Sequence, residues 1–168
     1  IAVYTGIFPV AKTEAGLAAV MGHEVVHALA RHGGERMSQN TLAQTTLQAI
    51  GIALGVSGAN PVVSQGAMAA LGVGAQVGVL LPFSRKHESE ADYVGVLLAA
   101  DAGYDPRESI QLWTRMGELS GGKSASEFMS THPSHETRIE QLEEWMAEAM
   151  PIYQSKPPAP NSELPQLR

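Results

Sequence analysis

The stretch Met21–Leu29 (MGHEVVHAL) constrains this chain more than any other, because it places two histidines four residues apart. On a helix, His23 and His27 project from one face, one turn apart. Two neutral imidazoles in this arrangement can each give a ring nitrogen to one zinc ion. Glu24 lies about 100° round the helix from His23, within reach of a water on that metal. The spacing His-Glu-x-x-His therefore predicts a zinc site in which Glu24 is the general base.

The flanking residues predict that this motif lies on an amphipathic helix. Thr13 suits the N-cap position, and Glu14 faces the positive end of the helix dipole. Gly33-Gly34 is expected to end the helix near His32. We expect the apolar residues of the helix to form one buried stripe, made of Leu17, Val20, Met21, Val25, Ala28 and Leu29.

The composition favours a single helical domain. A length of 168 residues is enough for one hydrophobic core, and 44% hydrophobic but only 5% aromatic residues favour closely packed helices. A net charge of −6 without a basic run argues against nucleic acid as a partner. Because the chain has no cysteine, the zinc ligands must be histidines and carboxylates. The expected fold class is mostly α, with a small β-element (α+β).

The ends of the chain are expected to differ from its body. Residues 1–150 are predicted to form the metal domain, and the proline-rich residues 151–168 an extended tail. Residues 1–8 (IAVYTGIF) are β-branched and aromatic, which predicts a short edge strand or half of a hairpin. Such a strand could bind an extended substrate by pairing with it, or be purely structural. The chain opens without a Met, so we expect a fragment whose targeting segment is not included.

The middle of the chain, residues 37–84, has no charged residue and no histidine. Residues 57–61 (SGANP) interrupt it, so we expect a helical hairpin, buried or at an interface. A membrane span needs ~20 mostly apolar residues, and the second half contains Ser64, Gln65 and Gln76. We therefore expect this stretch to be too polar to span a membrane. Contact with a membrane surface or with another copy of the chain remains open.

A third zinc ligand is expected from the charged segment Ser84–Asp92 (SRKHESEAD), since a catalytic zinc usually takes three protein ligands. Glu88 and Asp92 are four residues apart and share one helix face. One carboxylate can bind the metal while the other holds a ligand imidazole in place. His87 and Glu90 are alternative ligands that lie off this face, and spacing alone does not decide between them.

Three ordered motifs resemble a known peptidase family: HEVVH at 23–27, SRKHESEAD at 84–92 and THPSHETRI at 131–139. Over residues 1–146 the chain is similar to the gluzincin family of HtpX-like and CAAX prenyl endopeptidases. It is most similar to periplasmic LoiP-, YcaL- and BepA-like bacterial members, and more distantly to the mitochondrial Oma-type peptidase. The resemblance implies a zinc endopeptidase with one Zn²⁺ ion.

In that resemblance, the zinc ligands are His23, His27 and Glu88, and the general base is Glu24. The resemblance also implies that two residues support the ligands from behind, Asp92 and Arg138.

The same resemblance places His132 on the family's His-Pro segment. We expect His132 to donate a hydrogen bond to the oxyanion or, alternatively, to occupy the open metal position and keep the enzyme latent. The role of His135 stays open, because many members carry another residue there. The resemblance further implies polypeptide substrates, including misfolded envelope proteins, and a periplasmic or membrane-associated location.

Two other classes of function remain as alternatives. One is a latent protease that acts mainly as a chaperone or assembly-binding module, with the hairpin or the tail covering the zinc. The other is a structural zinc domain with a closed site. The second is disfavoured, because Glu24 inside the motif would then have no role.

Overall fold

The computed structural model describes residues 3–118 and 137–165, which divide between two compact units. The first unit comprises residues 1–29 and 88–168, and the second unit comprises residues 30–87. The described residues are mainly helical, and their only β-pairing is an isolated bridge between Thr13 and Glu163. The predicted class, a mostly helical domain, is confirmed.

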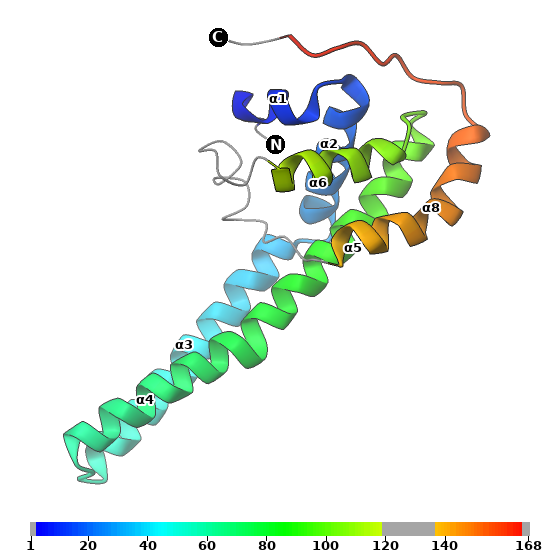
Figure 1. The fold of residues 1–168 in the computed structure, drawn as a ribbon. Helices are drawn as coiled ribbons and strands as arrows, with labels where there is room; N and C mark the ends of the chain where they lie inside the picture. Colours follow the sequence, from blue (N-terminus) through cyan, green and yellow to red (C-terminus); the bar gives the residue numbers. More distant parts are fainter. Residues whose placement is uncertain (1–2, 119–136, 166–168) are drawn as a thin grey trace. The chain divides into compact units, whose positions relative to one another are not determined.

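The first unit contains the zinc motif and most of the helices among the described residues (Figure 1). In chain order these are η1 (Thr5–Ile7), α1 (Phe8–Ala11), α2 (Glu14–Leu29), the later part of α5 (Leu81–Asp101), α6 (Arg107–Glu118) and α8 (Arg138–Gln154). Helix α6 packs against α1, α2 and α8.

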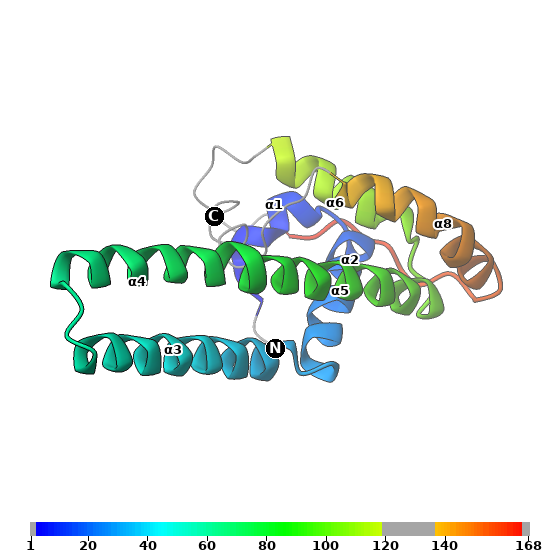
Figure 2. The same cartoon turned by 90° about the horizontal axis from the view of Figure 1, so that it is seen from below.

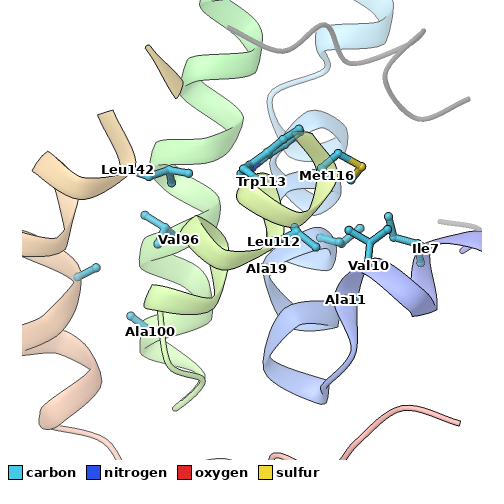
Figure 3. Packing of buried hydrophobic residues seen from close by; sticks show 12 residues of the cluster. Ile7, Val10, Ala11, Ala19, Val96, Ala100, Leu112, Trp113, Met116 and Leu142 are labelled. Atoms are coloured by element: carbon cyan, nitrogen blue, oxygen red, sulfur yellow. The ribbon is translucent and has the colours of Figure 1, made fainter. Parts of the chain in front are cut away.

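One apolar cluster forms the core of the first unit. Figure 3 shows Leu112 and Met116 of α6 close to Val10 of α1. Two glycines let the helices approach closely. A Cβ on Gly16 would lie 2.1 Å from the Ala11 carbonyl oxygen, and no side chain larger than hydrogen fits there. The second glycine is Gly22, where α2 crosses α5. A Cβ there would likewise come too close to the backbone of the other helix.

The second unit is the helical hairpin expected from the charge-free stretch. Helix α3 (His32–Val56) runs antiparallel to α4 (Pro61–Ala75), as Figures 1 and 2 show. Gly58 makes the turn with φ of 69°, a left-handed conformation that favours glycine. The Asn60 side chain then caps α4 by accepting a hydrogen bond from the Val62 amide (2.9 Å).

Helix α4 continues through a π-helical segment, η2 (Gln76–Leu80), into α5. Together they form a 41-residue helical stretch, Pro61–Asp101, which by length and composition could cross a membrane. Its most apolar window has a mean hydropathy of 1.6 and is 0% buried. The expectation that this segment is too polar to span is therefore not supported, because its few polar residues leave the mean hydropathy within the range of membrane spans.

The strand expected at residues 1–8 is wrong for the residues that the structure describes. Residues 5–11 form η1 and α1, and no strand lies among residues 3–118 and 137–165. Pro9 occupies one of the first two positions of α1, where its fixed φ suits a helix and its missing N–H costs nothing. The β-branched composition of this segment is a weaker signal than its local packing.

The expected end of the zinc helix is also wrong. Helix α2 ends at Leu29, and Gly33-Gly34 lies in the first turn of α3. The chain turns instead at Arg31, which has a left-handed φ of 58°. At the other end the prediction is confirmed, since the Thr13 hydroxyl accepts a hydrogen bond from the Gly16 amide (3.1 Å).

Beyond α8, the described residues of the C-terminal tail contain no helix, and they bind the start of the zinc helix. Helix α8 runs past residue 150 to Gln154. Further on, the Asn161 side chain accepts a hydrogen bond from the Ala15 amide (3.0 Å), and the Ser162 carbonyl accepts one from the Glu14 amide (3.0 Å). These bonds satisfy amide donors that the first turn of any helix leaves unpaired.

Candidate metal centre

The buried face of α2 directs one histidine of the zinc motif into the core. Of the predicted stripe only Val20 is buried, whereas Leu29 is 73% exposed. Small residues dominate the true buried face because α2 lies so close to its neighbours. Its members are Ala15, Gly16, Ala19, Val20, His23 and Val26.

Three side chains from two helices converge on one point in the first unit. The Nε2 atoms of His23 and His27 lie 3.0 Å apart. The Glu88 carboxylate, which comes from α5, approaches both rings. Its Oε2 lies 3.5 Å from His23 Nε2, and its Oε1 lies 3.4 Å from His27 Nε2. All these ligand atoms fit within 4.8 Å of one another, so the structure brings together the three residues expected to bind zinc.

Asp92 fixes the orientation of the His23 ring from the opposite side. Its Oδ1 lies 2.9 Å from His23 Nδ1, and both side chains are buried. With Nδ1 donating to the carboxylate, Nε2 keeps its lone pair and directs it toward the other ligand atoms. Asp92 lies one helical turn after Glu88 on α5, so the shared face predicted from their spacing serves both contacts.

Arg138 links the two buried carboxylates. Its Nη2 donates to Asp92 Oδ1 at 2.7 Å and lies 3.5 Å from Glu88 Oε2, while its Nε donates to Asp92 Oδ2. The guanidinium, in a side chain that is only 2% exposed, also stacks on Trp113, with Cζ 3.4 Å from the ring centroid. The sequence analysis does not single out Trp113, because nothing in its spacing indicates which side chain covers its face.

The charges at this point favour a cation. Burial opposes a charge on His23, but its hydrogen bonds to Asp92 and Glu88 outweigh burial, so the pKa of His23 lies above its ordinary value. The two carboxylates and the single guanidinium of Arg138 leave one negative charge in excess among these buried groups. Two imidazole nitrogens and one carboxylate oxygen are a donor set that suits zinc. The residues therefore fit the metal that the motif predicts.

The remaining candidate residues have other surroundings. Glu24 is partly buried on α2 and is not one of the three converging groups. His87 is buried, but its Nε2 lies 3.0 Å from Glu35 Oε2, within the second unit. Glu90 is exposed. His132 and His135 lie outside the described residues.

The chain matches Peptidase family M48 over residues 1–146. It is 40% identical over 149 residues to the "Mitochondrial metalloendopeptidase OMA1" of Schizosaccharomyces pombe, an alignment that covers 88% of this chain and 41% of that protein. It is also 40% identical over 158 residues to the protein of the same name from Arabidopsis thaliana, covering 91% and 29%. No solved structure matches the chain.

A bacterial relative is less similar. The "Putative beta-barrel assembly-enhancing protease" of Vibrio cholerae is 31% identical over 141 residues, covering 83% of this chain and 29% of that protein. The expectation that bacterial periplasmic members resemble the chain more than the mitochondrial peptidase does is therefore not supported by these identities. The chain spans less than half the length of these curated relatives.

Proposed function

The chain belongs to Peptidase family M48, and on that premise we propose that it is a zinc-dependent endopeptidase with Glu24 as the general base. The observation that carries the proposal is the convergence of His23, His27 and Glu88 on one point, with Asp92 behind the first ring. A ligand set of two histidines and one carboxylate leaves a fourth position of a tetrahedral zinc for water or substrate.

The residues of the chain have separate tasks in this mechanism. Zinc bound by the three ligands would supply a Lewis acid that polarises the scissile carbonyl and makes a bound water more acidic. Glu24 accepts the proton of the attacking water and delivers it to the leaving amine. Asp92 and Arg138 hold the His23 ring in one tautomer and orientation, so that little reorganisation is needed during the reaction.

An oxyanion donor completes the mechanism, and we propose His132 for this role. The alternative is that His132 occupies the open metal position and keeps the enzyme latent. The variant His132→Ala separates the two. Loss of hydrolysis with zinc retained supports the oxyanion donor, a gain of hydrolysis supports the latch, and no change excludes both.

The proposed substrates are extended or misfolded polypeptides at or near a membrane. Two relatives are named as a mitochondrial metalloendopeptidase and as a putative β-barrel assembly-enhancing protease. Protein quality control in a bacterial envelope or an organelle fits both names. A direct test incubates the zinc-loaded protein with unfolded casein, removes zinc with a chelator, and adds zinc back. Hydrolysis that ignores both steps would refute the metal mechanism.

The second unit supplies a proposed contact with lipid. Ten of its large apolar side chains are exposed, and no charged residue lies between residues 37 and 84. Helix α3 has 25 residues, a length of about 37 Å at 1.5 Å per residue, compared with about 30 Å for the hydrocarbon core of a bilayer. The exposed apolar residues are Met37, Leu42, Ile52, Val56, Val62, Val63, Leu71, Val73, Val77 and Val79.

Flotation with phosphatidylcholine vesicles tests this contact. The wild type is expected to float with the vesicles, and Val73→Asp, which places a charge on an exposed apolar position of α4, is expected to float less. Gln111→Asp is the matched control, since it adds the same charge at an exposed site on α6 in the first unit. A wild type that stays with the soluble fraction and instead forms oligomers would assign the surface to a second copy of the chain.

A further inference from the structure

One aromatic side chain of the core, Trp113 on α6, contacts the charged groups behind the metal centre. Trp113 belongs to the apolar cluster of the first unit, and Figure 3 shows it on the same helix as Met116. One face of its ring carries the Arg138 guanidinium, with Cζ 3.4 Å from the ring centroid. The ring also lies edge-to-face with the His23 imidazole, with centroids 6.3 Å apart. All these residues lie in the first unit, and the mechanism above gives Trp113 no role.

The hydrogen bonds of Arg138 hold its guanidinium along one edge. Its Nε and Nη2 both donate to the Asp92 carboxylate. Its Nη1 is buried and has no hydrogen-bond partner among residues 3–118 and 137–165. A two-pronged pair of this kind fixes the direction of the guanidinium, but it leaves the plane free to tilt about the bonded edge. The flat face of Trp113 lies against that plane and opposes the tilt.

The surroundings of this stack are nearly dry. The Arg138 side chain is only 2% exposed. Between Trp113, His23 and Asp92 lies a cavity of about 10 Å³, whose other walls are mostly apolar. This is about the smallest volume that holds one water molecule. A cation on the face of a tryptophan is held more strongly when both are removed from water, so the stack is a strong contact at this site.

We infer that Trp113 is a positioning residue for the zinc ligand His23, an inference that rests on the proposed function. The ring holds the plane of the Arg138 guanidinium, and the guanidinium holds the Asp92 carboxylate. That carboxylate lies 2.9 Å from His23 Nδ1 and directs Nε2 toward the metal. Without the ring face these groups move more freely, and zinc must order them when it binds, which lowers its affinity.

The first experiment compares two substitutions of similar size and measures metal binding. Zinc affinity comes from competition with a chromophoric chelator, and ligand geometry from the visible absorption of the cobalt(II)-substituted protein. Trp113→Phe keeps an aromatic face and should retain zinc affinity within about threefold. Trp113→Leu keeps apolar volume without such a face, so it should weaken zinc binding about tenfold and change the cobalt spectrum. Val10→Ala is the control, because it opens a cavity in the same core and should lower the unfolding temperature alone.

Fluorinated tryptophan tests the ring face without a substitution at residue 113. Fluorine withdraws the negative potential from the face of the ring and leaves its shape nearly unchanged. The chain has two tryptophans, so Trp145→Phe leaves Trp113 as the single site of incorporation. Zinc affinity should then fall stepwise as the fluorine content of the ring rises. In the reciprocal control, Trp113→Phe, only Trp145 is fluorinated, and zinc affinity should not depend on fluorine content.

A double-variant cycle tests whether Trp113 acts through Arg138. Arg138→Met removes the guanidinium but keeps most of the length of the side chain, and it should weaken zinc binding by itself. Adding Trp113→Leu to this variant should cause little further loss, because the contact is already absent. Losses that add in full would overturn the inference.

The outcomes distinguish this inference from the proposed function. A wild type without zinc affinity would refute the zinc function, and the inference with it. A wild type that binds zinc, with an affinity that does not respond to fluorination of Trp113, would overturn only the inference. A folded Trp113→Leu variant with unchanged zinc affinity and cobalt spectrum would do the same. Thermal unfolding of each variant shows whether it is folded at the temperature of the measurement.

Discussion

The two units of the molecule differ in the side chains that they bury and expose. The first buries charged side chains beside its apolar core, and the second exposes apolar ones. In the first unit, Glu88, Asp92 and Arg138 are almost completely buried, although charged residues normally stay in water. In the second unit, α4 has no buried residue, and its valines face outward. A buried charge is costly unless it is paired, and an exposed apolar face normally meets a partner. This contrast agrees with the proposed function, in which the first unit carries the chemistry and the second a contact surface.

Removing a zinc ligand should have the largest effect and should be confined to the first unit. Glu88→Ala is expected to lose zinc and with it all hydrolysis, because two imidazoles alone hold zinc weakly. Metal content after dialysis measures this, with the exposed Glu90→Ala as the control. Zinc content equal to wild type would exclude Glu88 as a ligand.

Removing the general base should come next in size. Glu24→Gln keeps the shape of the side chain but cannot accept a proton, so the rate of hydrolysis should fall about 10²–10⁴-fold. Zinc content should match the wild type, because Glu24 is not among the three converging groups. Near-normal turnover in this variant would rule out Glu24 as the base.

Weakening the support behind the metal should have an intermediate effect. Asp92→Ala removes the acceptor for His23 Nδ1 and leaves Arg138 without its closest partner. Zinc affinity should drop roughly ten- to a hundredfold, as it does when an outer partner of a ligand histidine is lost. Isothermal titration with zinc measures the change, and an affinity equal to wild type would show that the hydrogen bond does not orient the ring.

A charge on the hairpin should have the smallest effect on catalysis. Val73→Asp alters an exposed position of the second unit and is expected to change casein hydrolysis by no more than about twofold. The same variant should reduce vesicle flotation, so the two readouts separate the units. A large loss of hydrolysis in a folded Val73→Asp protein would contradict the division of tasks between chemistry and contact.

The metal centre could be predicted further from the sequence than the rest of the molecule. Helical periodicity alone places His23 above His27, and Glu88 above Asp92, whatever the tertiary structure. Each pair lies within one helix, so only the meeting of two helices had to be inferred. The stacking of Arg138 on Trp113 joins two helices that the sequence does not relate, and no local pattern could indicate it.

Two wrong expectations, the strand at residues 1–8 and the apolar stripe on α2, also failed because tertiary contacts decided the outcome. The strand expected at residues 1–8 relied on β-propensity, which depends strongly on neighbouring strands, and the described residues provide none. The expected stripe on α2 relied on side-chain size. Close crossings at Gly16 and Gly22 select small residues instead, so larger ones such as Leu17 stay only partly buried. The hairpin could be predicted, because Gly58 and Pro61 act locally.

The attachment of the tail to α2 sets an order of events during synthesis. The Ala15 amide is paired with Asn161, which lies 146 residues later in the chain. At about 5–20 residues per second, a ribosome needs several seconds to pass from one to the other. During that interval the Ala15 amide, in the helix that carries the histidines, lacks this partner. An unfinished chain therefore lacks these contacts at the start of α2 until residues 161 and 162 have been synthesised.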